Sequence, residues 1–454
     1  MSTHTAVVFV HGLLERRPMD TFEAFAKTML APRDGRWEYH PQPLEVTDSY
    51  EARRYAAPAA DLFEYDWSFL MTSSRYAGFF PAFLRLFLRR PRHVPDQLFG
   101  IWRLAWLVLL VPVAVLAGLL IVGGYFLHTG VAGWIVGLVT SVVVLSVALA
   151  VLRTAPRALA RSFLTTGFVN VARYFDPAPE SHAARRAIRG GLVDLLSTLQ
   201  QGQYARVVVV GHGLGGYIAY DALSALWAET YELHAGTGPG PHSLAEPNAE
   251  AGIDEFQASQ LALWQDLRAW GNPWRTTDFI TVGTPMVLAD LFVARPPIAA
   301  GLRRTDPRHA LFDTMARRGV VVRCPPLAEV SSSAENTLGG LSPFAVTRWT
   351  NIWFPVSRGG IRGDWFGGLL RPLFGPGIRD IAVSGNRPQR LRPGVPQTRY
   401  FKDPDRDADG DVAFHLRQVL ALGDDGIIGA SATAPEPDPA TVGRVVHRSW
   451  QRSM

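Results

Sequence analysis

The chain has very little cysteine: Cys324 is the single one among 454 residues. One cysteine excludes a disulfide within the chain, and with it a fold held together by disulfides. Cys324 lies in the apolar stretch VVVRCPP, and we expect it to be a small buried residue at the end of a strand. The first residues, MSTHTAVVFVHG, lack the basic and long apolar regions of a secretory signal. We therefore expect the soluble part of the chain to stay in the cytoplasm.

Lysine is nearly missing too, since Lys27 and Lys402 are the only two, and arginine carries most of the positive charge. Charged residues form only 19% of the chain and hydrophobic residues 48%, with a formal net charge of +5. This balance lies toward the apolar end for a soluble protein and favours a membrane segment. The arginines gather beside apolar runs and do not form a basic stripe with interleaved aromatic residues. Membrane lipid is therefore a better predicted partner than nucleic acid.

Two long runs without charge occupy residues 104–127 and 131–152. Each is long enough to cross the hydrocarbon core as a helix, and the three-residue link makes the pair antiparallel. Arginines flank both outer ends, which predicts a transmembrane helical hairpin in the inner membrane with the remaining chain on the cytoplasmic side. A buried helix pair and a re-entrant or interfacial hairpin are the alternatives. Upstream, PAFLRLFLRR at 81–90 predicts a basic interfacial helix or an ordinary amphipathic surface helix.

The hairpin divides the chain into four parts: residues 1–80, a basic segment with the hairpin at 81–165, a second soluble part at 166–428, and a tail at 429–454. The tail begins with an Ala/Pro-rich stretch that predicts disorder. Strands are predicted at 6–10, 206–210, 278–282, 320–323 and 349–354, and helices at 20–30, 183–200, 214–233 and 259–270. Strands that alternate with helices predict a doubly wound, mostly parallel α/β sheet.

The stretch VVVVGHGLGG places a run of valines directly before a glycine-rich turn and a helix. It resembles the G-x-S-x-G turn of α/β hydrolases, in the lipase version GHSLGG, and its glycines are then steric requirements of a tight turn. The resemblance implies an α/β-hydrolase fold in which Gly213 takes the position of the nucleophilic serine. Covalent acyl transfer needs a hydroxyl or thiol at that position, and glycine has neither.

Three explanations of Gly213 stay open on the sequence alone. The residue was changed deliberately, or the protein is a natural pseudoenzyme, or GHGLGG is the G-x-G-x-x-G turn of a dinucleotide-binding unit. The last one requires an acidic residue at the end of a second strand about 20 positions on. Glu229 and Glu232 fall near that distance, but in what reads as the same continuing helix.

Later motifs extend the resemblance to lipases. ITVGTPM at 280–286 is similar to their strand and G-T-P turn, and WTNIWF at 349–354 is similar to their W-x-N strand. The resemblance then implies that Asp364 is the triad acid and His415 the triad base, in the chain order that α/β hydrolases have. In these roles His415 moves the proton and Asp364 orients its imidazole. Asp290 and Asp411 are rival acids.

The oxyanion donors follow from VFVHGLL at 8–14, which resembles the strand and His-Gly pair of lipases. The backbone N–H of Leu13 or Leu14 and that of Leu214 are the expected donors. The histidines of the two motifs, His11 and His212, complete the expected binding set. The arginines of the Glu-Arg-Arg stretch at 15–17 bind an anionic headgroup or are simply solvated.

Together the motifs imply a membrane-anchored, lipase- or esterase-like serine hydrolase scaffold acting on acyl or lipid esters, inactive or strongly impaired because of Gly213. The alternative is a natural pseudohydrolase that binds lipid or a protein partner without catalysis. No metal and no organic cofactor is expected in either case, because triad chemistry needs none.

Overall fold

The structure is a computed structural model that describes residues 4–12, 20–30, 40–57, 60–71, 84–100, 171–234, 252–269, 271–327, 338–356, 363–384, 400–401 and 411–420, with scattered positions between 102 and 146. Several predicted features lie outside these residues: Leu13 and Leu14, the Glu-Arg-Arg stretch, most of the predicted hairpin, and the tail from 429.

A nine-stranded mixed sheet forms the centre of the described fold, in the order β2-β4-β5-β1-β6-β7-β8-β9, with β3 paired to β4. The six strands from β5 to β9 along this order are parallel, and β2, β3 and β4 form an antiparallel edge. The bounds are β1 Thr5–Val10, β2 His40–Pro41, β3 Glu45–Val46, β4 Glu51–Ala56, β5 Ala60–Asp66, β6 Arg206–His212, β7 Thr276–Val282, β8 Arg348–Trp353 and β9 Ile378–Ala382.

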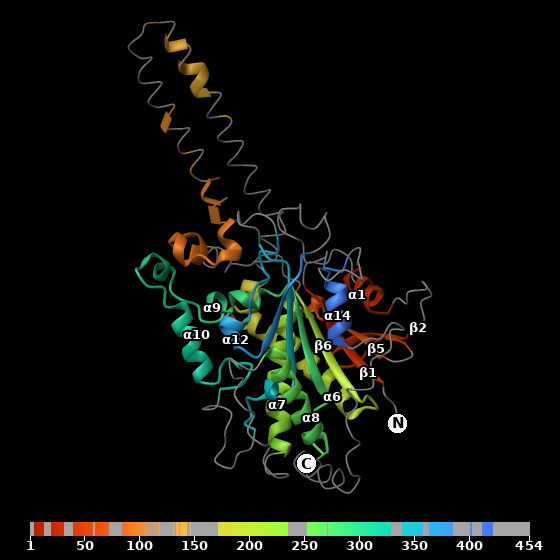
Figure 1. Ribbon diagram of the computed structural model, residues 1–454. Helices are drawn as coiled ribbons and strands as arrows, with labels where there is room; N and C mark the ends of the chain where they lie inside the picture. The colour runs from red at the N-terminus through yellow and green to blue at the C-terminus, as the bar shows by residue number, and fades with distance from the viewer. Residues whose placement is uncertain are drawn as a thin grey trace.

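Helices cover both faces of the sheet (Figure 1). Side chains of α1 and α14 pack on one face, and those of α6, α7 and α8 pack on the other. The α-helices are α1 Asp20–Leu30, α6 Pro179–Gln201, α7 Leu214–His234, α8 Ile253–Ala269, α9 Ala289–Phe292, α10 Arg308–Arg317, α12 Arg371–Phe374 and α14 Val412–Leu420. Short 3₁₀ helices are η1 Ser68–Met71, η2 Pro91–His93, η3 Pro285–Leu288, η4 Ile298–Leu302 and η5 Pro343–Ala345.

Burial on both faces explains the valine runs of the central strands. In β1, Val8 and Val10 pack with the α6–α7 side, and Val7 and Phe9 pack with the α1–α14 side. All residues of β1 and β6 are buried. A strand between two layers of helices needs apolar side chains at every position, which gives a continuous run and no alternation.

The prediction of an inserted transmembrane hairpin is wrong for this fold. Among the described residues, no helix is both long enough and apolar enough to cross a membrane. The long described helices α6 and α7 instead carry charged side chains, among them Glu180 and Asp221. The spans predicted at 104–127 and 131–152 lie mostly outside the described residues, so the α/β sheet with its helices is the architecture that the structure gives.

The strand predicted at 320–323 is also absent; these residues form a bend and an extended connection after α10. The backbone of Val322 is paired with a side chain instead of a strand: its N–H donates to the Tyr220 hydroxyl (2.6 Å), which donates to the Val322 carbonyl (2.9 Å). Cys324, two residues on, is fully buried, as predicted.

The W-x-N motif fastens three neighbouring strands. Asn351 on β8 donates to Asp380 on β9 (2.7 Å) and to the Gly368 carbonyl (2.8 Å), and accepts from Thr281 on β7 (3.0 Å). Asn351 is fully buried, so these bonds satisfy an amide that has no access to water. The motif thereby fixes β7, β8 and β9 where their carboxyl ends approach the candidate site.

Candidate functional site

The turn between β6 and α7 is the part of the chain predicted to carry the nucleophile. Gly213 has φ +55°, in the left-handed region that non-glycine residues adopt at a cost. Its N–H donates to the Val282 carbonyl at the end of β7 (2.9 Å), and its carbonyl accepts from the Gly216 N–H (3.2 Å). Leu214 begins α7 immediately afterwards, so the turn is as sharp as the motif predicts.

The other glycines of the turn allow close approach of backbone to backbone. A Cβ on Gly215 would overlap the Val10 carbonyl oxygen at the end of β1 and lie 2.7 Å from the His11 oxygen. A Cβ on Gly211 would overlap Gly216, and one on Gly216 would lie 2.7 Å from Thr284 Oγ1. Contacts this short leave no room for any side chain, so these glycines are steric requirements.

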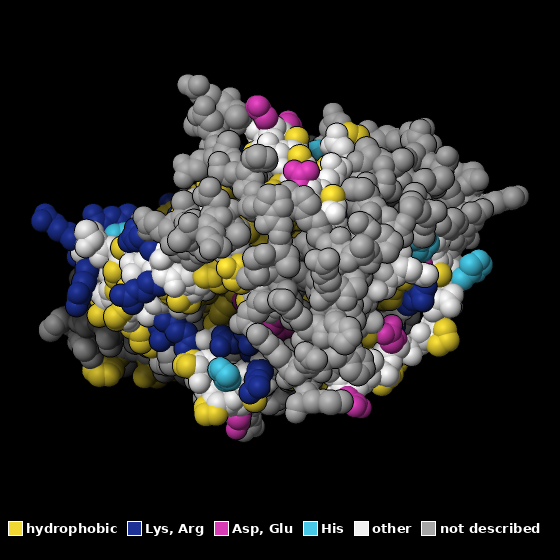
Figure 2. All heavy atoms as spheres, turned by 90° about the horizontal axis from the view of Figure 1, so that it is seen from below, with side chains coloured by type: hydrophobic (Ala, Val, Ile, Leu, Met, Phe, Trp, Pro, Cys, Tyr) yellow, Lys and Arg dark blue, Asp and Glu magenta, His cyan; other side chains and the backbone are white. Residues whose placement is uncertain are grey.

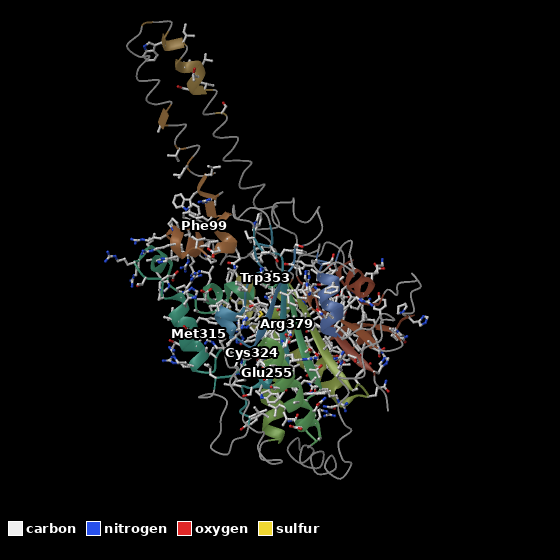
Figure 3. All side chains as sticks on the ribbon, viewed as in Figure 1. Phe99, Glu255, Met315, Cys324, Trp353 and Arg379 are labelled. Atoms are coloured by element: carbon white, nitrogen blue, oxygen red, sulfur yellow. The ribbon has the colours of Figure 1, made fainter. Side chains whose placement is uncertain are left out.

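Asp364, the predicted triad acid, lies just after the carboxyl end of β8, where its N–H donates to the Phe354 carbonyl (3.1 Å). Figure 3 labels Trp353, the last residue of β8, and shows Arg379 nearer the opposite end of the sheet. The Asp364 side chain is fully buried and accepts from the Phe366 N–H (2.8 Å) and the Tyr400 hydroxyl (2.5 Å). Burial raises its pKa to about 6, and hydrogen bonds from Tyr400, Phe366 and Gly367 oppose the rise.

Tyr400 is the partner that sequence reasoning missed. Its hydroxyl donates to Asp364 and accepts from the Phe354 N–H (3.2 Å), and burial raises its pKa well above the usual value. Its ring lies against Gly283, which also has φ +55° and whose added Cβ would lie 2.6 Å from the ring. No local periodicity surrounds Tyr400; the aromatic pair Tyr400–Phe401 is the one signal of burial in its neighbourhood.

His415, the predicted base, is not among the hydrogen-bond partners of Asp364. It lies partly exposed in α14, with its ring centroid 5.3 Å from that of Phe414, while Val412, Leu416 and Leu420 form the buried face of the helix. The structure therefore brings Asp364 together with Tyr400, and the role of His415 as the base stays a prediction.

The two histidines of the expected binding set, His11 and His212, contact different parts of the structure. His212, at the end of β6, is buried against Phe9, Tyr400 and Phe401, so it connects the turn to the partner of Asp364 through ring contacts. His11, at the end of β1, faces away toward β5. Its Nδ1 donates to the Gly12 carbonyl (3.0 Å), and its Nε2 lies 3.5 Å from Asp66.

Contacts with Asp66 and Trp67 hold His11 in this position. Its hydrogen bond is the main cause that lowers the pKa of Asp66 to about 2, and Trp67 stacks on the imidazole while donating to the His11 carbonyl (3.0 Å). Such an arrangement orients the backbone that follows β1, against which Gly215 packs. This favours a positioning role for His11 at the turn, and its place in the expected binding set stays a prediction.

The rival acids have other partners. Asp290 lies 3.1 Å from both Arg308 Nε and His309 Nδ1, within a group of charged residues that also includes the ion pair of Arg89 and Asp306. Asp411 caps α14 by accepting from the Ala413 N–H (2.9 Å). Neither carboxyl is bonded to Tyr400.

The dinucleotide alternative lacks its acidic residue at a strand end. Glu229 and Glu232 both lie inside α7, which continues to His234, and the next described strand is β7. The described residues also contain no group of three or more His, Cys, Asp or Glu side chains suited to a metal ion.

We find no protein-family model, curated protein or solved structure that matches the chain. The functional argument therefore depends on the geometry of this turn and its neighbours.

Replacing Gly215 with alanine should destabilise the protein by about 3 kcal/mol, because the new Cβ overpacks against main-chain atoms that cannot yield. Chemical denaturation measures the change. Gly190→Ala is the matched control, since nothing lies within 4 Å of its added Cβ and it sits in helix α6. There alanine should stabilise by about 1 kcal/mol. Equal effects of the two substitutions would contradict the steric role of Gly215.

The raised pKa of Asp364 predicts a pH dependence of stability. The folded state holds this proton more tightly than the unfolded state, so the contribution of Asp364 is fully present below about pH 4 and is lost as the pH rises through 6. The rise of the Asp364 pKa to about 6 corresponds to roughly 3 kcal/mol in the free energy of unfolding. Asp364→Asn removes this dependence, whereas exposed Asp96→Asn keeps it. Urea denaturation between about pH 4 and 7 tests it; parallel curves for the native chain and Asp364→Asn would count against it.

Proposed function

We propose that this chain has an α/β-hydrolase-like scaffold and binds an acyl or lipid ester without forming a covalent intermediate. The observation that carries the proposal is the left-handed Gly213 at the crossover from β6 to α7. A turn of this shape presents its central residue above the sheet, and here that residue has no side chain to react.

The order of the parallel strands supports the scaffold. β5, β1, β6, β7, β8 and β9 lie side by side, so the loops that follow them emerge at one edge. Ligands of open α/β sheets bind at the carboxyl ends of strands, at the point where the chain changes direction along the sheet. The chain does so between β1 and β6, since β5 lies on one side of β1 and all later described parallel strands lie on the other.

The turn offers groups that suit an ester oxygen, but no nucleophile. α7 places its amino end at the turn, where backbone N–H groups and the helix dipole favour a carbonyl or carboxylate oxygen. Asp364 is occupied by the Tyr400 hydroxyl and by backbone N–H groups. These bonds hold the Asp364 side chain in place after β8, and the missing side chain at Gly213 is what favours binding over hydrolysis.

A serine hydrolase whose nucleophile has been replaced is the second candidate. The positive φ of Gly213 favours it, because the nucleophile of a strained elbow turn has this conformation. The two candidates differ in whether a serine at position 213 would restore ester hydrolysis.

Gly213→Ser distinguishes them, with Gly213→Ala as control for the cost of a Cβ at positive φ, about 1 kcal/mol. For a binding scaffold, both variants bind a dansyl-labelled fatty acid as the native chain does, and neither reacts with an alkyl fluorophosphonate. Labelling of the serine variant alone, together with turnover of a p-nitrophenyl ester, would overturn the proposal in favour of the hydrolase.

Lipid is the proposed source of the ligand, and residues 84–107 supply a surface for it. Trp106 stacks on Phe87 with ring centroids 4.4 Å apart, and Arg103 lies 4.5 Å above the ring of Phe99. Leu107, at 59% exposure, points to solvent. Aromatic rings combined with arginines and exposed aliphatic side chains suit the interface of an anionic lipid layer.

Further exposed arginines lie on the same flank. Figure 1 shows residues 84–100 beside α9 and α10, and Figure 2 shows positively charged side chains gathered on the side where Figure 1 places α10. Among the described residues, exposed arginines here include Arg90, Arg92, Arg303, Arg304, Arg317 and Arg318. A flank of one charge attracts anionic headgroups and is weakened by salt.

Arg90→Gln/Arg92→Gln should weaken binding to phosphatidylglycerol vesicles by about 1 kcal/mol for each charge and leave binding to phosphatidylcholine unchanged. Arg186→Gln/Arg189→Gln on α6 removes the same charge elsewhere and should have a much smaller effect. Vesicle flotation measures both. Equal losses in the two double variants would assign the attraction to net charge and not to this surface.

A further inference from the structure

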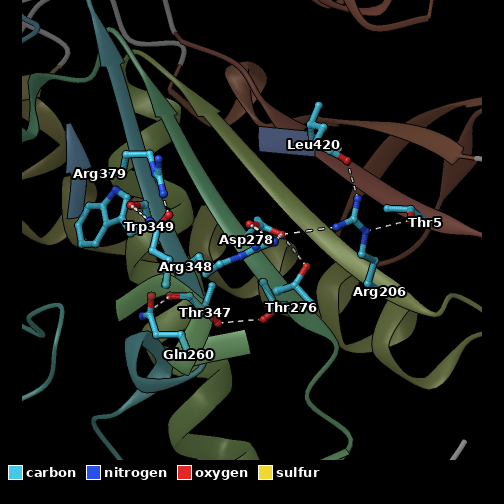
Figure 4. Close-up of polar contacts among 12 residues, drawn as sticks. Thr5, Arg206, Gln260, Thr276, Asp278, Thr347, Arg348, Trp349, Arg379 and Leu420 are labelled. Carbon is cyan, nitrogen blue, oxygen red and sulfur yellow. Dashed lines mark hydrogen bonds and ion pairs between the residues drawn. The ribbon is translucent and has the colours of Figure 1, made fainter. Parts of the chain in front are cut away.

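A pocket lies at the opposite end of the sheet from Gly213. Arg206 and Arg348 are the first residues of β6 and β8, and Asp278 and Arg379 lie near the starts of β7 and β9. The register places Asp278 beside Arg348, so these side chains follow one another across neighbouring strands (Figure 4).

The pocket is a cavity of about 270 Å³. Besides these four strand residues, Gln257 of α8 and Gln418 of α14 contribute to its lining. Three guanidinium groups and one carboxylate therefore face the same small space. The excess of positive charge indicates that an occupant would be an anion.

Arg206 gives the strongest indication that the pocket binds a ligand. The side chain is 2% exposed, and burial lowers its pKa. Its Nε donates to Thr5 Oγ1 (3.2 Å) and its Nη2 to the Leu420 carbonyl (2.6 Å). Its Nη1 has no hydrogen-bond partner among the described residues and lies 3.8 Å from Asp278 Oδ2. A buried charged donor left without a bond is costly, and an anion would satisfy it.

Asp278 does not neutralise the pocket by itself. Its Oδ2 already accepts from Thr277 (2.8 Å) and from Arg348 Nη2 (2.9 Å). Arg348 Nε, in turn, is buried and without a hydrogen-bond partner in the described part of the chain. The Asp278 carboxylate thus lies beside both Arg206 and Arg348. Each of these arginines keeps one N–H donor without a hydrogen bond in the described residues, Nη1 of Arg206 and Nε of Arg348.

Arg379 completes the set from the edge of the sheet. Its Nε donates to Gln257 Oε1 (2.8 Å), and its Nη2 pairs with Asp254. The Asp254 side chain is 82% exposed, so water screens this ion pair and Arg379 keeps most of its attraction for an anion.

We propose that this pocket binds the phosphoryl group of a small phosphate or phosphomonoester. Planar guanidinium groups bind phosphate oxygens with paired, charge-assisted hydrogen bonds, and a dianion balances the excess charge of three arginines over one aspartate. The cavity has room for the phosphoryl group with a small organic part. The site is independent of the acyl-ester function proposed for the Gly213 turn.

Isothermal titration of the full chain with inorganic phosphate, and separately with glycerol 3-phosphate, tests the proposal at low ionic strength. Both ligands should bind. Arg348→Gln and Arg379→Gln should each weaken binding roughly tenfold, the usual loss for one charged hydrogen bond. Both arginines are partly exposed, so these variants avoid the folding risk of changing Arg206. Arg186→Gln, on the surface of α6, is the matched control and should leave binding unchanged.

The same titration separates free phosphate from a lipid headgroup. Binding of phosphatidate vesicles without binding of either soluble phosphate would overturn the proposal, since the headgroup would then act at the arginine-rich flank. An equal loss in Arg186→Gln and Arg348→Gln would overturn it too, because it would show attraction to net charge. Failure of acyl-ligand binding at the Gly213 turn leaves these outcomes unaffected.

Discussion

The contact of Gly215 with the main chain of Val10 holds the amino end of α7 against the end of β1. A side chain at position 215 would overlap this main chain, so the close approach of α7 to β1 requires glycine there. In the turn just before, Gly213 is in the left-handed region, and its N–H donates to Val282 on the next strand. The approach of α7 to the carboxyl edge therefore depends on the absence of a side chain at position 215.

A buried carboxyl beside this turn is stabilised by a phenol and by backbone amides. Asp364 has no cation among its recorded hydrogen-bond partners, so its ionised form is disfavoured, and the Tyr400 hydroxyl and the amides of the following residues limit that cost. Tyr400 in turn packs on Gly283, which has the same backbone conformation as Gly213 one strand earlier. Left-handed glycines thus follow two neighbouring strands. Gly213 precedes the start of α7, and Gly283 leaves space for the ring of Tyr400.

The central strands and long helices could be predicted from the sequence because their burial is continuous. The valines of β1 and β6, the length of α1 and the run from Gly213 into α7 all appear as local patterns. Strand β4, EARRYA, could not, since the polar residues of a half-buried strand near the edge of the sheet resemble those of a loop.

Predictions that depended on distant contacts were incomplete or wrong. The sharp glycine turn lies where the motif predicts it, but the bond from Tyr400 to Asp364 joins residues 36 positions apart and leaves no local pattern. The run at 320–323 has the composition of a strand, yet the Tyr220 hydroxyl pairs with both backbone groups of Val322 in its middle. Apolar runs predicted a membrane hairpin that the described helices do not contain.

The position of β1 has a consequence for how the protein reaches its native state. Thr5 of β1 pairs with Ala60 of β5 on one side and with Arg206 of β6 on the other. One neighbour of β1 is therefore synthesised about 200 residues after it. β6 in turn pairs with β7, which ends at Val282. During synthesis the apolar edge of β1 is therefore unprotected until β6, which ends at His212, has left the ribosome. Such late, non-local pairing makes folding slow and exposes the nascent chain to aggregation, so this topology calls for chaperone assistance in the cell.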